Sequence, residues 1–339
     1  MPKPLPVFSP GRTLACLGIA GQANKSDLST GEFHIAERGF MAGFTMESGM
    51  LTLRAGALEL LLAPARGGGV ARFDFRRSDS EIIPIFRPFD EADPRPVALA
   101  SFPLVPFVNR IRDGRFEFRG RRVTLAQNMH PDPSPLHGQG WLAPWATVRS
   151  GQGGAELAYR HEAGDWPWAY EARQLFALDQ LGLTVDLTCT NRSDEPMPCG
   201  LGQHPYFPCT PATRLDAEVE SVWTIDAKVL PVDKVPATGR YGLRDRLVCG
   251  QGLDHGFGGW GGVARIADPA LPFAIEIGSS DGRFFQLYSP AGGGLFVAEP
   301  VTHANAALNE PEEKWAELGI RVLEPGETMR LSSRFSIVQ

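Results

Sequence analysis

Two polar residues able to move protons interrupt apolar stretches of this 339-residue sequence. Glu299 follows the apolar run 295–298, and a carboxylate there is costly unless it is hydrogen-bonded or takes part in a reaction. His204 directly precedes Pro205, which removes a backbone donor and stiffens the chain, so we expect the histidine at a fixed strand end. Such a placement suits an acid or a base, whose geometry matters before its pKa. A core histidine bonded to backbone explains His204 alone equally well.

A second pair of polar residues lies in the apolar stretch 107–111, shortly before a glycine turn. Arg110 offers a fork of donors that suits the hydroxyl groups of a ligand, and Asn109 stands beside it. The alternative is a structural arginine paired with Asp113 at the turn, and the segment by itself favours this alternative.

A histidine between glycines marks a third segment, 136–141. The glycines beside His137 let a ligand approach the backbone, and the faces of Trp141 and Trp145 suit the C–H surfaces of a sugar. An ordinary loop histidine is the alternative interpretation. Asp254 is a weaker candidate for binding, because aspartates are common in turns.

These residues are embedded in segments with the alternation of β-strands. The clearest is 183–189, where apolar and polar residues alternate, so that one face is buried and one is wet. Similar alternation occurs in 273–277, 284–288, 295–298 and 329–338, paired runs at 51–62 and 115–125 predict hairpins, and 310–318 is expected to be a short helix or turn. Strands at this spacing without intervening helices predict an all-β sandwich or barrel.

The composition agrees with a β-rich globular protein and excludes some functions. Gly 38 and Pro 29 suit many short strands and turns, and 43% hydrophobic residues suffice for a core. A net charge of -6 makes nucleic acid an unsuitable partner, and no apolar run has the roughly 18 residues of a membrane span. An apolar run at 14–20 is too short and lacks the exit site of a secretion signal.

The cysteines are odd in number, scattered and without a CxxC pair, so we expect neither a disulfide framework nor a zinc site, and a cytoplasmic location fits best. They are Cys16, Cys189, Cys199, Cys209 and Cys249.

The chain divides at about residue 45. Residues 1–45 show no sustained period of 2 or 3.6 and are expected to form a poorly ordered N-terminal extension, with a single domain over 46–339. Met41 and Met46 precede the first strand-like run, so a start codon assigned too far upstream would explain the same pattern.

Several motifs occur together in one order, and the combination resembles the aldose 1-epimerase (galactose mutarotase) family over about residues 50–338. The motifs are NRIRDGRFEFRG from Asn109, LHGQGW around His137, NRSDEPMPCGLGQHPYF through His204, LDHGF around Asp254, EPVTHANAALN from Glu299, and LEPGE near the end. The resemblance implies a β-supersandwich that interconverts the α and β anomers of a free monosaccharide without metal or organic cofactor. The monomer and the homodimer are both left open.

By the same resemblance, Glu299 is the base that takes the proton of the C1 hydroxyl, and His204 is the acid that protonates the ring oxygen. Asn109, Arg110, His137 and Asp254 match positions that hold the sugar. The chain departs from the longer family members in the loop 138–145 and in lacking a recognisable glutamine-bearing strand between Tyr288 and Glu299. These departures leave the choice of sugar open.

Three alternative functions compete with this interpretation. A hexose-6-phosphate 1-epimerase would need additional basic residues to hold a dianion, and the segment 137–145 contains no arginine. A sugar-binding protein without turnover would not require a matched acid and base. A glycoside hydrolase would need two suitably spaced carboxylates, for which Asp254 and Glu299 are the available pair.

Overall fold

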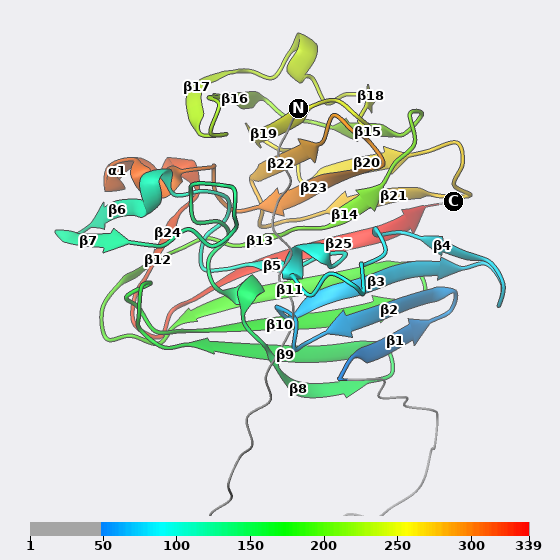
Figure 1. The fold of residues 1–339 in the computed structure, drawn as a ribbon, viewed down its shortest axis with the longest axis horizontal. Coiled ribbons are helices and arrows are strands. Elements are labelled where there is room, and N and C mark those ends of the chain that lie inside the picture. Colours follow the sequence, from blue (N-terminus) through cyan, green and yellow to red (C-terminus); the bar gives the residue numbers. More distant parts are fainter. Residues whose placement is uncertain (1–48, 339) are drawn as a thin grey trace, which may run out of the picture. The chain divides into compact units, whose positions relative to one another are not determined.

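The structure is a computed structural model that describes residues 49–338, and antiparallel β-sheets dominate it. The largest sheet has nine strands, and long alternating strands form its centre (Figure 1). In spatial order its strands are β18 (Arg246–Leu247), β15 (Arg214–Ala217), β20 (Val263–Ala267), β21 (Ala274–Gly278), β25 (Thr328–Val338), β11 (Gly182–Asn191), β10 (Tyr170–Asp179), β9 (Gly154–His161) and β8 (Ala146–Gly151).

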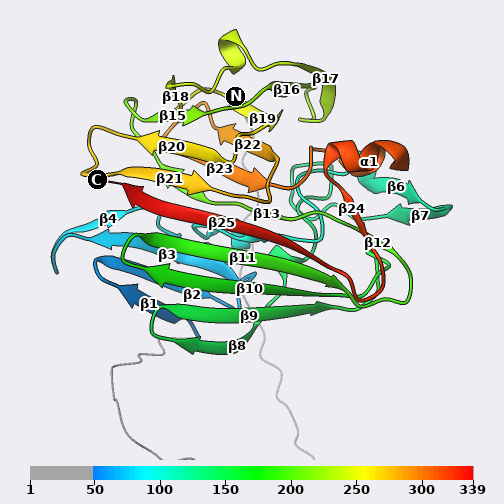
Figure 2. The same ribbon diagram turned by 180° about the vertical axis from the view of Figure 1, so that it is seen from behind.

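The second large sheet has eight strands and contains several of the polar residues of the candidate site. Its strands are β17 (Pro231–Pro236), β16 (Ser221–Ile225), β19 (Leu253–Gly258), β22 (Phe284–Ser289), β23 (Leu295–Val301), β13 (Gly202–Gln203) and β5 (Pro103–Leu104), with β14 (Tyr206–Pro208) also paired to β23. Figure 2 shows β13, β16, β17, β19, β22 and β23 of this sheet from behind.

Smaller sheets complete the described residues. A four-stranded sheet consists of β1 (Leu51–Ala55), β2 (Leu58–Ala63), β3 (Gly69–Arg76) and β4 (Ile82–Pro84), and two-stranded pairs consist of β6 (Arg115–Phe118) with β7 (Arg121–Thr124) and of β12 (Met197–Cys199) with β24 (Arg321–Leu323). The single α-helix of residues 49–338 is α1 (Glu312–Leu318). Short 3₁₀ turns lie at Pro96–Ala98, Arg112–Gly114, Gly140–Leu142, Gly239–Tyr241 and Ala307–Asn309.

The structure confirms the predicted all-β class and the strands from which this class was predicted. Strand β11 alternates buried and partly exposed residues along most of its length, as the pattern at 183–189 predicts. The hairpins predicted at 51–62 and 115–125 are β1–β2 and β6–β7. Helix α1 falls inside the predicted segment 310–318 and ends at Gly319, which has the positive φ of 88° that glycine adopts without strain.

An aromatic cluster joins three of the sheets. The ring of Phe86 makes edge contacts, with ring centroids 5.0–5.3 Å apart, to Phe73 of β3, Phe207 of β14 and Phe335 of β25. All four side chains are at most 1% exposed. Burying a phenylalanine contributes roughly 1.5–3 kcal/mol, so this cluster is a substantial part of what fixes the sheets against each other.

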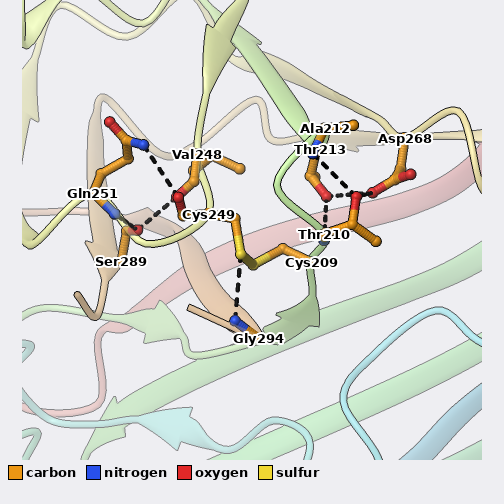
Figure 3. The surroundings of a disulfide bond; sticks show 10 residues. All are labelled: Cys209, Thr210, Ala212, Thr213, Val248, Cys249, Gln251, Asp268, Ser289 and Gly294. Atoms are coloured by element: carbon orange, nitrogen blue, oxygen red, sulfur yellow. Dashed lines mark hydrogen bonds between the residues drawn. A yellow bond between two sulfur atoms is a disulfide. The ribbon is translucent and has the colours of Figure 1, made fainter. Parts of the chain in front are cut away.

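The cysteine pattern did not imply a disulfide framework, and the structure nevertheless contains one disulfide among the described residues. Cys209 and Cys249 are joined by a disulfide, with their Cα atoms 5.7 Å apart (Figure 3). Cys209 follows β14, and Cys249 precedes β19, so strands of the same sheet bring together residues that are far apart in the sequence. Cys189 and Cys199 are free and buried.

Two further predictions concern the ends of the chain and membranes. The N-terminal extension predicted at 1–45 lies outside the described residues, so the division into an extension and a domain stays a prediction. Within residues 49–338, no helix has the length and apolar character needed to cross a bilayer.

Candidate active site

Adjacent strands of the eight-stranded sheet carry polar side chains on one face. Gln286 in β22 is the register partner of both Glu299 in β23 and Gly256 in β19. Residues two apart on a strand point to the same face, so Asp254 shares the face of Gly256. A hydrogen bond of 2.7 Å from Gln286 Nε2 to Asp254 Oδ1 joins the two side chains. The sheet therefore presents a carboxylate, an amide and a second carboxylate side by side.

His204 is placed opposite Glu299 by the pairing on either side of it. Gly202 pairs with Val301 and Tyr206 pairs with Val297, and His204 lies midway between these pairs. At this point Pro205 interrupts the strand, and the His204 N–H instead donates to the carbonyl of Phe102 (3.1 Å). His204 Nε2 lies 3.5 Å from Glu299 Oε1.

Burial acts on both members of this pair. The His204 ring stacks on Phe102, with centroids 4.4 Å apart, and Tyr206 flanks it at 4.7 Å. Burial lowers the pKa of His204 to about 3, because the imidazolium loses its hydration. Burial likewise raises the pKa of Glu299 well above its usual value, and the nearby Asp254 adds to this rise while Arg110 opposes it.

Two residues with left-handed backbones, Asn109 (φ 59°) and His137 (φ 62°), hold each other in place. The Asn109 N–H donates to His137 Nδ1 (3.1 Å), and the His137 N–H donates to the Asn109 carbonyl (3.0 Å). Because Nδ1 accepts, the neutral ring carries its proton on Nε2. Burial lowers the pKa of His137 well below its usual value, with His204 and Arg110 adding to the effect, so His137 is a neutral donor. Gly138 permits this arrangement, since a Cβ there would lie 2.1 Å from the Val105 oxygen.

Arg110 binds several side chains from different segments. Its Nε donates to Asp132 Oδ2 (2.8 Å), its Nη1 donates to Asn109 Oδ1 (2.9 Å), and its Nη2 lies 3.5 Å from Asp254 Oδ2. The alternative pairing with Asp113 expected from the sequence does not occur. The backbone N–H of Arg110 donates to Asn305 Oδ1 (3.1 Å), which fixes the chain from the opposite side.

The site is closed at one end and more open at the other. The side chain of Glu299 is 3% exposed, those of Arg110 and His204 are 10% and 11% exposed, and that of Asp254 is 23% exposed. A ligand that enters past Asp254 would therefore meet Arg110 before the buried pair of His204 and Glu299.

The structure brings all six residues selected from the sequence into one continuous group. Contacts run from Glu299 to His204, from the His204 ring to His137 (centroids 5.4 Å apart), and on to Asn109, Arg110 and Asp254. What each of the six does in a reaction remains a prediction.

The sequence did not reveal two polar neighbours of these residues, Gln286 and Asp132. Gln286 is a buried amide within the largely apolar strand β22, and it precedes Tyr288 rather than lying between Tyr288 and Glu299, where a glutamine-bearing strand was expected. Asp132 looks like an ordinary turn residue among prolines. The side chains of Trp141 and Trp145 are 2% and 4% exposed, and their indole N–H groups donate to the carbonyls of Leu136 (3.1 Å) and Gly140 (2.8 Å), so contact of their faces with a sugar stays a prediction.

The sequence also matches known proteins. The family model of aldose 1-epimerases matches residues 49–336. The uncharacterized protein YphB of Escherichia coli (strain K12) is 33% identical over 272 residues, which cover 77% of this chain and 90% of YphB.

Solved structures have the same fold. A crystal structure of a candidate aldose 1-epimerase from Escherichia coli K12 superposes with a TM-score of 0.75 at 29% identity, covering 85% of this chain and 98% of that one. A galactose mutarotase-like protein from Clostridium acetobutylicum superposes with a TM-score of 0.73 at 18% identity, covering 85% and 94% of the two chains, a likeness of fold.

Proposed function

The chain belongs to the aldose 1-epimerase family, and from this premise we propose that it interconverts the α and β anomers of a free aldose by acid/base chemistry that needs no metal. The observation that carries the proposal is the buried pair of His204 and Glu299, whose nearest nitrogen and oxygen are 3.5 Å apart. Mutarotation requires proton transfer at the C1 hydroxyl and at the ring oxygen. Both oxygens are bonded to C1, so an acid and a base held this close can serve one each.

In the proposed reaction, Glu299 takes the proton of the C1 hydroxyl while His204 gives a proton to the ring oxygen. The bond between C1 and the ring oxygen breaks, and C1 becomes an aldehyde carbon. After rotation about the C1–C2 bond, His204 removes the proton from the attacking hydroxyl and Glu299 returns its proton to the C1 oxygen. Both residues end in their initial states, and the sugar leaves with inverted configuration at C1.

The remaining polar groups suit the binding of an uncharged polyol. Neutral His137 and the guanidinium of Arg110 supply donors, and Asp254 supplies an acceptor whose other oxygen is held by Gln286. Donors and acceptors in alternation match sugar hydroxyls, which both donate and accept. These four residues would thus orient the ring while His204 and Glu299 exchange protons with it.

Polarimetry tests this proposal. We expect the purified protein to accelerate the mutarotation of a freshly dissolved α-aldose, with glucose and galactose as first substrates, in the presence of EDTA. Glu299→Gln keeps the shape of the side chain and removes its basicity, so kcat should fall roughly 10²- to 10⁴-fold while sugar binding persists.

Glu276→Gln is the matched control, because Glu276 is an exposed carboxylate in β21 of the other large sheet. This variant should keep the wild-type rate. Wild-type rates equal to the buffer background on every aldose would refute mutarotation, and sugar binding without turnover would identify a binding protein. If only the mutarotation of hexose 6-phosphates is accelerated, the substrates are hexose 6-phosphates and not free aldoses.

A further inference from the structure

We propose that Asp132 is a positioning residue that holds Arg110 in the orientation needed to bind an uncharged sugar. This inference rests on the proposed function and adds a specificity-determining segment to it, residues 127–135. The first observation is a close, sheltered ion pair. Arg110 Nε donates to Asp132 Oδ2 at 2.8 Å, and the two side chains are 10% and 13% exposed.

This pair differs in environment from the ion pairs on the surface. In the pair of Arg77 and Glu81, for example, the side chains are 60% and 49% exposed. Exposed pairs contribute little, since water and salt screen the charges and mobile side chains lose entropy. A charge-assisted hydrogen bond between sheltered groups is stronger and fixes geometry.

Asp132 is itself held in place. Its Oδ1 accepts a hydrogen bond from the Ser134 N–H (2.9 Å), and its carbonyl accepts one from the Gln127 side-chain amide. The side-chain amide of Asn128 binds Leu136 through both its polar atoms: Oδ1 accepts from the Leu136 N–H (2.8 Å), and Nδ2 donates to the Leu136 carbonyl (2.7 Å). The segment 127–135 is therefore tied to Leu136, which forms a β-bridge with Arg110.

The contacts of Arg110 show what Asp132 controls. With Nε held by Asp132 and Nη1 by Asn109, the remaining Nη2 lies 3.5 Å from Asp254, beyond a good hydrogen bond. Without Asp132, the guanidinium could rotate and bind the Asp254 carboxylate through two donors. In that arrangement the guanidinium donors of Arg110 and the carboxylate acceptor of Asp254 would bind each other and would no longer be available to the sugar hydroxyls.

Asp132 also sets the charge at the open end of the site. There Arg110 faces the carboxylates of Asp132 and Asp254, so two negative charges already lie beside its one positive charge. A phosphate dianion would meet repulsion from these carboxylates, whereas an uncharged sugar pays no such cost. Asp132 thus favours free sugars over sugar phosphates.

The test compares Asp132→Asn with Asp113→Asn in mutarotation assays. Asp113 is an exposed carboxylate three residues from Arg110 without contact to its guanidinium, which makes it a matched control. Asp132→Asn leaves one acceptor oxygen for the two donors Arg110 Nε and Ser134 N–H, and it removes the negative charge. We therefore expect Asp132→Asn to raise KM for the free sugar roughly ten- to hundredfold, with kcat changed less than about threefold. The ratio of kcat/KM for the 6-phosphate to that for the free sugar should rise, and Asp113→Asn should change neither value.

A double-mutant cycle separates positioning from direct contact. In an Arg110→Ala background, Asp132→Asn should cause no further rise in KM, because Asp132 acts through Arg110. Additive effects would show that Asp132 binds the sugar itself and would overturn the positioning role. A folded Asp132→Asn protein, judged by circular dichroism and melting temperature, with an unchanged KM would overturn it as well.

Saturation-transfer NMR with the same sugars distinguishes failure of this inference from failure of the proposed function. If the wild-type protein binds sugar but does not turn it over, the proposed reaction is refuted. In that case, weaker sugar binding by Asp132→Asn than by Asp113→Asn would still support the positioning role of Asp132. Equal binding by the two variants would refute it. A wild-type protein that binds no sugar would overturn both.

Discussion

His204 and Glu299 share a buried environment that opposes charge on either of them. Burial lowers the pKa of His204 and raises that of Glu299, so between the two values the pair holds one proton. That proton can reside on the carboxyl or on the imidazole, and both arrangements have the same net charge. The reaction proposed above needs one proton on the pair, and it therefore proceeds over the whole range in which the pair keeps it.

The first prediction concerns pH. We expect kcat/KM for mutarotation to vary less than about threefold between the His204 pKa of about 3 and the raised pKa of Glu299, because the pair keeps one proton over this range. The acid limb follows the second protonation of the pair, at the His204 pKa of about 3, where Glu299 can no longer accept a proton. The alkaline limb lies at the raised pKa of Glu299, above which the pair has no proton to give.

Initial rates by polarimetry, corrected for buffer catalysis and with folding checked at each pH, provide the measurement. An acid limb centred at the ordinary glutamate value of 4.5 would show that burial does not govern the pair.

Single residues could be selected from the sequence where their type conflicts with their surroundings. Glu299 and His204 stand out because ionisable groups are unusual beside apolar strands. Gln286 and Asp132 could not be given a role in this way, because their significance depends on partners that the sequence does not place. Gln286 lies beside Glu299 through strand register, and Asp132 reaches Arg110 through a loop whose path no periodicity predicts.

At the scale of elements, alternation predicts the strands but not their pairing. The apolar pattern at 183–189 fixes which face of β11 is buried, yet nothing local states that β11 lies between β10 and β25. The disulfide has the same origin, since strand β14 pairs with β23, and β22 separates β23 from β19 in the same sheet. Cys249 Sγ also accepts a hydrogen bond from the Gly294 N–H (3.3 Å), just before β23 (Figure 3).

This cross-link joins segments next to the proposed site. Cys209 stands five residues after His204, and Cys249 stands five residues before Asp254. Disulfides persist mainly in oxidising compartments, so the cysteine pattern no longer supports a cytoplasmic location, which stays a prediction.

We expect this disulfide to contribute to the stability of the fold. The bridged cysteines are 40 residues apart, and closing a loop of this length in the unfolded chain is worth roughly 2–4 kcal/mol. Cys209→Ser combined with Cys249→Ser should lower the free energy of unfolding by this amount in urea titrations. Dithiothreitol should destabilise the wild type similarly and leave the double variant unaffected. Equal midpoints for the oxidised wild type and the double variant would contradict the expectation.

At the scale of the whole molecule, the site is a product of long-range folding. Asn109 and Arg110, His137, His204, Asp254 and Glu299 come from five separate segments, and the contacts among them cross between segments. The sequence could predict the class of fold and the members of the site through motif order. It could not predict the distances within the site, because each depends on sheet register and on loops between distant strands.

The same reasoning applies to the part of the chain that lies before the described residues. Every residue of the candidate site is between Asn109 and Glu299, and residues 1–45 have no sustained apolar period in their sequence. A segment without an apolar face has little to bury against a domain. Deleting residues 1–45 should therefore leave kcat/KM for mutarotation nearly unchanged and lower the melting temperature by less than about 3 °C, the equivalent of roughly 1 kcal/mol in a domain of this size.

A deletion at the other end is the contrasting control. Residues 332–338 belong to β25, which pairs with both β11 and β21, so their removal would break hydrogen bonds on both sides of a central strand. We expect that variant to lose its cooperative unfolding transition, as measured by calorimetry. A loss of comparable size after deletion of residues 1–45 would show that the N-terminal segment packs on the domain and that the boundary predicted near residue 45 is wrong.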